Sequence, residues 1–217
     1  ACIEEGLELR ESGITNPILL LEGIFDPDEL PLVDEYRFSI AVATQQQLNW
    51  LLASKLKQPI DVFLKIDSGM HRLGIEPEDA KEAYAKLDAS SKVRSIVLMT
   101  HFAQADEPDQ PATNSQFERF TKVIEGIEGP CSLSNSAGTL AHPATHQQFV
   151  RPGIMLYGAT PLGHAHETDA LLKPAMSLRS AIFSIRELAV GEPIGYAGRY
   201  VCDRPTRVGV VAMGYAD

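Results

Sequence analysis

Ile60-Asp-Val-Phe-Leu-Lys-Ile-Asp67 is the stretch of sequence that best indicates the fold class. Its apolar run, Ile60–Ile66, is followed by a helix-like segment, Pro77–Leu87, and then by a second apolar run, Val93–Thr100. Glu76-Pro77 places a proline in the first turn of that helix, where the missing amide proton of proline costs nothing. An apolar strand, a helix and another apolar strand in this order predict parallel strands joined by a helical crossover.

The same alternation extends in both directions along the chain. Further apolar runs predict strands at Pro17–Leu21, Phe38–Val42, Ser132–Ser134 and Ile154–Tyr157, and helix-like segments lie at Glu4–Glu11, Thr44–Leu56, Asn114–Ile127 and Ala137–His142. Thr44 and Asn114 are the predicted N-caps of their helices. Strands that are apolar on both faces suit a doubly wound sheet or a barrel, and about six of the eight strands of a closed βα-barrel are recognisable.

The pattern changes after Gly163. Three segments without helical periodicity between them predict β-strands separated by Gly and Pro turns: Ser177–Arg186, Glu192–Cys202 and Arg207–Met213. We therefore expect an α/β chain with a partial (β/α)8 TIM-type barrel over residues 1–163, followed by the start of a mostly antiparallel β-domain over residues 164–217. We also expect the chain to be the middle of a longer protein, because it begins inside a repeat unit and stops directly after a strand.

Composition excludes some classes of partner. The 217 residues carry a formal net charge of -10, which argues against nucleic acid, whose partners usually present a basic face. No apolar run reaches the roughly 18 residues of a membrane-spanning helix, so we expect no membrane partner. Three widely separated cysteines form no metal-binding spacing and indicate reduced thiols in the cytoplasm.

Lys65 is the most unusual residue of the opening stretch, because burying an ammonium group is costly unless a partner balances it. One interpretation is a structural ion pair with Asp61 or Asp67. The other is that Lys65 and Arg72 both face the mouth of the barrel, where an anionic ligand or a modified lysine balances the two charges. His101 ends the next apolar run and is of interest only if it has a partner.

Polar residues follow the later strands as well. Ser136 lies in Ser134-Asn-Ser-Ala-Gly138, which suits either a phosphate cradle at a helix start or an ordinary N-cap. Arg151 precedes a predicted strand and is compatible with structural capping, while Gly153 can let a ligand approach the backbone closely. Tyr215 follows a glycine at a strand end, and its phenol needs cationic neighbours to work as a base.

Taken together, these segments resemble the alanine racemase family. The resemblance rests on six stretches in the family's order: Ile18-Leu-Leu-Leu-Glu-Gly23, Leu64-Lys-Ile-Asp-Ser-Gly-Met-His-Arg-Leu-Gly74, Thr100-His-Phe-Ala-Gln-Ala-Asp106, Asn135-Ser136, Val150-Arg-Pro-Gly-Ile-Met-Leu-Tyr-Gly158 and Met213-Gly-Tyr-Ala-Asp217. The resemblance implies a pyridoxal 5'-phosphate cofactor, alanine as the small-molecule substrate, D-alanine for peptidoglycan as the product, and a homodimer.

The resemblance also implies a role for each candidate residue. Arg151 matches the arginine that bonds the cofactor's pyridine nitrogen, and His101 matches the histidine beside it. Tyr215 matches the catalytic tyrosine, which takes or returns the α-proton in the partner's site. Arg72 matches an arginine near the cofactor and the substrate carboxylate, and Lys65 matches a lysine that is often carbamylated. Ser136, Gly153 and Ile154 match phosphate-binding positions.

One family feature is missing from these residues. The Schiff-base lysine, which stands before a tyrosine and a Gly-His-Gly stretch, has no match, so we expect this chain alone to be inactive. Two alternatives therefore stay open: an inactive fragment or binding module, and a racemase of another small amino acid. A small pyridoxal-phosphate-homeostasis barrel fits poorly, because such proteins lack the β-domain and its tyrosine.

Overall fold

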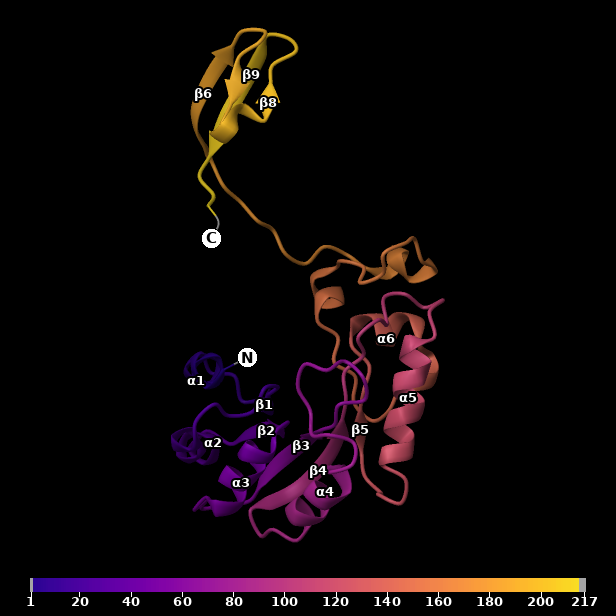
Figure 1. Ribbon diagram of the computed structural model, residues 1–217. Coiled ribbons are helices and arrows are strands. Elements are labelled where there is room, and N and C mark those ends of the chain that lie inside the picture. Colours follow the sequence, from indigo (N-terminus) through magenta and orange to yellow (C-terminus); the bar gives the residue numbers. More distant parts are fainter. Residues whose placement is uncertain (1, 215–217) are drawn as a thin grey trace. The chain divides into compact units, whose positions relative to one another are not determined.

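A computed structural model describes residues 2–214 of the chain. It divides into two compact units, Ala1–Pro174 and Ala175–Asp217 (Figure 1). Each unit has its own sheet or sheets, and each is considered by itself. The predicted domain boundary between Gly163 and His164 remains a prediction.

The first unit is a βα-repeat. Its elements in chain order are α1 (Ile3–Glu11), β1 (Ile18–Leu20), the 3-10 helix η1 (Pro27–Glu29), α2 (Leu30–Glu35), β2 (Phe38–Val42), α3 (Gln45–Ala53), β3 (Ile60–Lys65), α4 (Ala80–Asp88), β4 (Val93–Met99), α5 (Ala112–Val123), β5 (Cys131–Ser132), α6 (Ser136–Ala141), η2 (Pro143–Thr145), η3 (Ile154–Tyr157) and η4 (Glu167–Leu171). The strands are parallel and pair in the order β1-β2-β3-β4-β5. Because sequential strands are neighbours throughout, the sheet is a curled half-barrel and not a doubly wound sheet.

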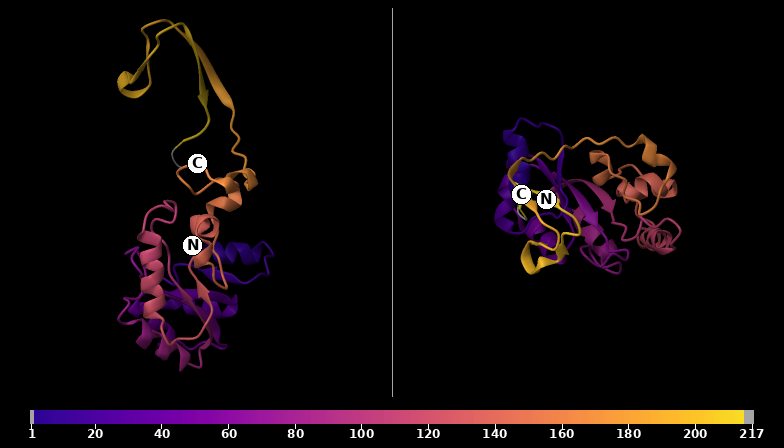
Figure 2. Two further views of the ribbon diagram at one scale, coloured as in Figure 1. Left: turned by 90° about the vertical axis from the view of Figure 1, so that its right-hand side faces the viewer. Right: turned by 90° about the horizontal axis from the view of Figure 1, so that it is seen from above.

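The core lies between this sheet and its helices, and α5 runs alongside the sheet in both Figure 1 and Figure 2. Val62 and Leu64 of β3 are fully buried, and so are Leu51 of α3 and Leu87 of α4. Burial of a side chain of this size stabilises the fold by about 1.5–3 kcal/mol. Ile40, Ala41 and Val42, three consecutive residues of β2, are also fully buried, so this strand is apolar on both faces, as predicted.

One predicted strand of the first unit was wrong. Ile154–Tyr157 is the 3-10 helix η3 and not a strand, with hydrogen bonds from Leu156 N to Gly153 O and from Gly158 N to Met155 O, both 3.0 Å. Four apolar residues carry too little periodicity to separate a strand from one helical turn. Gly158, at φ 83°, ends the turn, and a Cβ there would meet the Lys173 carbonyl oxygen at 2.0 Å.

Helix starts were predicted with mixed success. The Thr44 hydroxyl caps α3 by accepting a hydrogen bond from Gln47 N at 3.1 Å, which confirms that N-cap. The predicted cap at Asn114 was wrong, because α5 begins at Ala112 and Asn114 lies exposed inside it. The short helix α2 was missed, since its six residues carry little helical periodicity.

The second unit is antiparallel β-structure, as predicted. β6 (Ile182–Leu188) pairs with β9 (Thr206–Val211), and β7 (Pro193–Ile194) pairs with β8 (Tyr200–Val201). The predicted single strand Glu192–Cys202 was wrong: a turn, η5 (Tyr196–Gly198), divides it into a hairpin. Positive φ angles at Gly195, Ala197 and Gly198 reverse the chain there. Over the described residues, no helix has both the length and the apolar character needed to span a bilayer.

Candidate active site

A cavity of about 490 Å³ opens at the carboxyl ends of the strands of the first unit. The ends of β1, β3 and β4, with the segments after them and after β5, line it: Leu21, Glu22, Lys65, Arg72, Leu73, Met99, His101, Asp106, Asn135, Ser136, Ala137, Arg151, Gly153, Ile154 and Pro161. Functional groups gather at this end of βα-barrels, because the loops after the strands meet there. The volume is within the range of small-molecule sites.

Lys65 ends β3 with only 7% of its surface exposed and borders the cavity. Neither predicted ion pair forms among the described residues. Arg94 and Ser95 bond the carboxylate of Asp61, and Asp67 bonds the loop that follows it. Burial, together with the positive charges of Arg72 and Arg151, lowers the pKa of Lys65. Lys65 is therefore a buried amine among cations, which favours a neutral or modified form or an anionic ligand.

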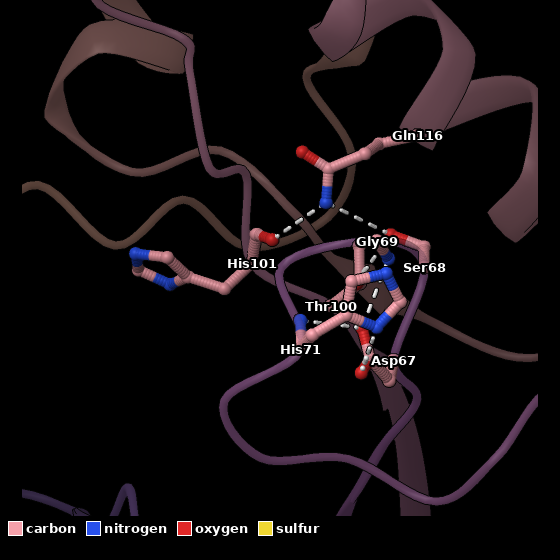
Figure 3. A network of polar contacts seen from close by, with 7 residues as sticks. All are labelled: Asp67, Ser68, Gly69, His71, Thr100, His101 and Gln116. Atoms are coloured by element: carbon pink, nitrogen blue, oxygen red, sulfur yellow. Dashed lines mark hydrogen bonds and ion pairs between the residues drawn. The ribbon is translucent and has the colours of Figure 1, made fainter.

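The loop after β3, which carries Arg72, is fixed by Asp67. One carboxylate oxygen of Asp67 accepts the N–H groups of Gly69 at 2.9 Å and His71 at 3.1 Å, and the other lies 3.0 Å from His71 Nδ1 (Figure 3). Although burial opposes it, these N–H donors hold the pKa of the Asp67 carboxyl below its usual value. Gly74 closes the loop at φ 153°, where a Cβ would meet Asp67 N at 2.4 Å.

Arg151 forms one wall of the cavity and is tied to several segments of the chain. Its Nη1 donates to Ser132 Oγ at 2.6 Å, and its Nη2 donates to the carbonyls of Thr100 at 2.6 Å and Leu133 at 3.2 Å. Burial lowers the pKa of Arg151 to about 10, so the guanidinium stays charged at neutral pH. None of these bonds uses the Nε–H, and the group is held rigidly beside the cavity.

His101 lies next to Arg151, with Nδ1 3.2 Å from Nη2. An arginine can only donate, so Nδ1 accepts, and a neutral imidazole then carries its proton on Nε2. Burial and the neighbouring charges of Arg151, Arg72 and Lys65 lower the pKa of His101 to about 4. The ring is therefore a neutral acceptor towards Arg151 at pH 7.

Ser136 and the turn at Gly153 meet on another side of the cavity. The Ser136 hydroxyl accepts the N–H groups of Gly153 at 2.8 Å and Met155 at 3.4 Å. Asn135 caps α6 by accepting Gly138 N at 2.9 Å, so the N-cap interpretation of this stretch applies to Asn135. A hydroxyl and backbone N–H groups gathered in one place are the donors that a phosphate uses.

The structure brings seven of the eight candidate residues to this one cavity: Lys65, Arg72, His101, Ser136, Arg151, Gly153 and Ile154. The eighth, Tyr215, lies outside the described residues. Sequence reasoning did not single out Glu22 and Asp106, which contribute carboxylates to the lining. A polar residue directly after an apolar run is the signal that points to Glu22, since it follows β1 by two residues.

Three basic side chains around one cavity stand out in a chain whose formal net charge is -10. Within residues 2–214 no group of three His, Cys, Asp or Glu side chains could hold a metal ion. The fold and the cavity thus define the class: a βα-barrel protein with a charged site of small-molecule size at the carboxyl ends of its strands.

Comparison with known proteins identifies the family. Residues 1–161 match the family model "Alanine racemase, N-terminal domain", and residues 175–217 match "Alanine racemase, C-terminal domain". The chain belongs to the alanine racemase family, whose members are generally dependent on pyridoxal phosphate.

Individual relatives agree with this assignment. The catabolic alanine racemase of Pseudomonas putida is 52% identical over 217 residues, which are 100% of this chain and 61% of the relative. The alanine racemase of Xanthomonas axonopodis pv. citri is also 52% identical, over 100% of this chain and 59% of the relative. The chain thus spans about three fifths of the length of these relatives.

Solved structures have the same fold. The biosynthetic alanine racemase of Pseudomonas aeruginosa superposes with a TM-score of 0.90 at 43% identity, covering 100% of this chain and 61% of that one. The Bacillus anthracis alanine racemase, solved with bound L-Ala-P, gives a TM-score of 0.79 at 28% identity, covering 100% of this chain and 58% of that one. These structures support the predicted combination of a TIM-type barrel and a following β-domain.

Proposed function

We propose that the protein containing this chain is a pyridoxal-phosphate-dependent alanine racemase that interconverts L-alanine and D-alanine. The observation that carries the proposal is the convergence of Lys65, Arg72 and Arg151 on one cavity at the strand ends of a member of this family. The cofactor carries a phosphate and a phenolic oxygen, and the substrate carries a carboxylate. Arg72 and Arg151 supply two fixed positive charges at this cavity for that set of negative charges.

The residues present fit the cofactor. The N–H groups of Gly153 and Met155 point to Ser136 Oγ, and a phosphate bound there would replace this oxygen as their acceptor and take the Ser136 hydroxyl proton as a further donor. Ile154, the first residue of η3, contributes a further N–H, because the first amides of a helix have no partner within it. We therefore assign the phosphate to Ser136, Gly153 and Ile154. When bound, the cofactor's ring withdraws electrons from the substrate and weakens the bond between Cα and its proton.

Arg151 would hold the ring nitrogen of the cofactor. Nη2 is engaged with Thr100, Leu133 and His101, and Nη1 uses one proton on Ser132, so the Nε–H and the second N–H of Nη1 are available, and we assign the Nε–H to the ring nitrogen. Because an arginine keeps its proton, the ring nitrogen stays unprotonated and withdraws electrons less strongly. This restrains the enzyme to proton transfer at Cα and limits side reactions.

Arg72 would bind the substrate carboxylate, and its loop is fixed for that purpose by Asp67. We propose that Lys65 is carbamylated. That modification converts a buried amine into an anion and balances the charge of Arg72. Alanine as substrate is supported by the names of the relatives and by the L-Ala-P bound in the Bacillus anthracis structure.

Tyr215 would take the α-proton from L-alanine and return it, with its phenol oxygen as the base. The cations around the cavity would stabilise its phenolate form. By resemblance to the family, we propose that the protein is a homodimer in which Tyr215 acts in the partner's site. A second base for the D-alanine side is the family's cofactor-holding lysine, which matches none of the lysines in these 217 residues. We therefore propose that the chain by itself is inactive.

We propose a cytoplasmic location, supported by three unpaired thiols at Cys2, Cys131 and Cys202. We also propose that the D-alanine serves peptidoglycan synthesis. Disruption of the gene should then make growth depend on added D-alanine. Unchanged growth without D-alanine would contradict this role and leave the reaction itself untouched.

The reaction is tested with the complete protein, loaded with pyridoxal 5'-phosphate and given L-alanine, L-serine or L-valine in parallel. Chiral chromatography then measures the D-enantiomer of each. We expect D-alanine to form with the highest kcat/KM of the three. Faster inversion of serine or valine would favour a racemase of another small amino acid, and no inversion of any substrate would overturn the proposal.

A further inference from the structure

Gln116 of α5 connects the two loops that carry Arg72 and His101. Its side chain is only 5% exposed. The amide oxygen accepts the N–H of Ala103 at 2.8 Å. The amide nitrogen donates to the carbonyl of His101 at 3.1 Å (Figure 3). The same nitrogen lies 3.4 Å from Ser68 Oγ in the loop after β3.

The network continues through buried hydroxyls. Ser68 and Thr100 are each 1% exposed, and their hydroxyl oxygens lie 2.7 Å apart. Because Gln116 donates to Ser68, the proton of Ser68 is available for Thr100. The backbone carbonyl of Thr100 in turn accepts a hydrogen bond from Arg151 Nη2 at 2.6 Å. A chain of buried hydrogen bonds thus runs from α5 across both loops to the guanidinium.

We propose that Gln116 is a positioning residue that holds the backbone at His101, so that the imidazole keeps its contact with Arg151. This inference rests on the proposed function only where it predicts a change in kcat for alanine. Figure 3 shows why the backbone matters: the His101 ring points away from the network, and only the carbonyl of His101 is bonded to Gln116. Gln116 therefore acts on the ring through the main chain.

The hydrogen bond between His101 and Arg151 is sensitive to small shifts of the His101 backbone, because it is already long. His101 Nδ1 lies 3.2 Å from Arg151 Nη2, at the long end of the range for a hydrogen bond. A backbone shift of a few tenths of an ångström at His101 would break it. The charged groups around the cavity are Lys65, Arg72 and Arg151, with the carboxylates of Glu22 and Asp106. A ring released from Arg151 and turned towards solvent would accept a proton more readily.

The chain contains a matched control on another helix. Gln47 of α3 is 7% exposed, accepts the N–H of Ala43 at 2.8 Å and donates to the carbonyls of Glu22 at 2.8 Å and Ile24 at 3.0 Å. Gln47 thus makes three bonds of the same kind, but it joins the loops after β1 and β2. Replacing it removes a similar set of buried hydrogen bonds without acting on the backbone at His101.

The test compares Gln116→Met, Gln116→Glu and Gln47→Met in the complete protein. The first measurement is the titration of the His101 imidazole by NMR in the cofactor-free protein with labelled histidine, which requires no racemase activity. We expect both glutamine-to-methionine variants to lower Tm by similar amounts. Only the Gln116 variants should raise the His101 pKa above its value of about 4, by roughly one pH unit or more.

Gln116→Glu is a second variant that keeps the test possible if Gln116→Met does not fold. Its carboxylate still accepts from Ala103, but it can no longer donate to His101 or Ser68, so the same direction of change is expected. In the loaded protein, the Gln116 variants should lower kcat for alanine by about tenfold and move the acid limb of its pH profile. These effects should be much smaller in Gln47→Met.

A His101 titration that is unchanged in the Gln116 variants would overturn the proposal, and so would an equal change in Gln47→Met. The titration separates this inference from the proposed function. Absence of racemisation in the unmodified protein contradicts the proposed function alone, because the His101 pKa can still be compared among the variants.

Discussion

At the scale of single residues, Arg151 is the most constrained group of the site. Its guanidinium donates to one hydroxyl and two carbonyls and contacts one imidazole, and these partners come from the ends of two strands, β4 and β5. Nη2 shares its two protons among three of these acceptors while Nη1 donates to the fourth, a set of directions that the planar fork of an arginine covers and a lysine ammonium does not. Arg151 therefore joins β4 and β5 as well as facing the cavity.

Arg151→Lys should lower the free energy of unfolding by about 2–4 kcal/mol, because buried acceptors lose charged donors. Urea unfolding of the complete protein measures the loss. The control is Arg94→Lys, whose arginine is exposed and pairs with Asp61, so a loss of less than about 1 kcal/mol is expected. Equal losses of unfolding free energy in the two variants would contradict the assignment of Arg151 as a buried residue whose hydrogen bonds hold two strand ends together.

The folded protein should also lose stability in acid through His101. Its pKa is about 4 in the folded state and about 6.5 in an unfolded chain, so the unfolded state binds a proton first as the pH falls. The stabilising contribution of the neutral ring is fully present above about pH 6.5 and is lost between about pH 6.5 and 4.

His101→Gln should flatten the curve of unfolding free energy against pH in this window, and urea unfolding at several pH values measures it. The other histidines titrate in both proteins, so the difference between the two curves belongs to His101. Parallel curves from pH 7 to 4 would contradict the low pKa of this residue.

At the scale of elements, prediction from sequence succeeded where burial and local hydrogen bonding agree. β3 and β4 were found within one residue of their observed ends, because each is a long apolar run. The predictions failed at η3, where four apolar residues form a turn, and at Asn114, where a good capping residue lies inside a helix. A polar residue type permits a cap, but the preceding backbone decides whether one forms.

The location of the cavity could be predicted from the sequence, because polar residues at the ends of parallel strands must meet at one edge of the sheet. The hydrogen-bond partners of each site residue could not be predicted from the sequence. Nothing in the sequence near Gln116 indicates that its side chain reaches His101, since that contact depends on how α5 packs. Likewise, the sequence allowed an ion pair between Asp61 and Lys65, but in the structure Arg94 of the neighbouring strand bonds the Asp61 carboxylate.

The two predicted caps give a direct test at this scale. Thr44→Ala should cost about 1 kcal/mol of unfolding free energy, because α3 loses the acceptor for Gln47 N. Asn114→Ala should change stability by less than about 0.5 kcal/mol, because Asn114 is an exposed residue inside α5. Chemical denaturation measures both, and a larger loss for Asn114 would show that the helix start is wrongly placed.

At the scale of the whole molecule, the sheets are incomplete. In the described part of the chain β1 pairs on one side, β5 has beyond β4 no more than an isolated bridge from Ser132 to Phe149, and the second unit consists of two-stranded sheets, which are marginal alone. Its strands also expose large apolar side chains: Ile182, Phe183, Ile185, Val210 and Val211. Open edges and exposed apolar strands favour association with other chains.

We therefore expect the isolated 217-residue chain to aggregate or to unfold without a sharp transition. Size-exclusion chromatography with light scattering, followed by a thermal melt, measures this. A monodisperse monomer with one cooperative transition would contradict the expectation and would mean that the half-barrel is stable without further strands.

The most direct test of the central claim follows the α-proton of alanine. The complete protein, loaded with pyridoxal 5'-phosphate, is incubated in D2O with L-alanine and, separately, with D-alanine, and proton NMR is combined with chiral separation. The account predicts that each enantiomer yields the other with deuterium at Cα, because a proton is removed on one face and returned on the opposite one. Exchange without inversion, or no exchange at all, would contradict it.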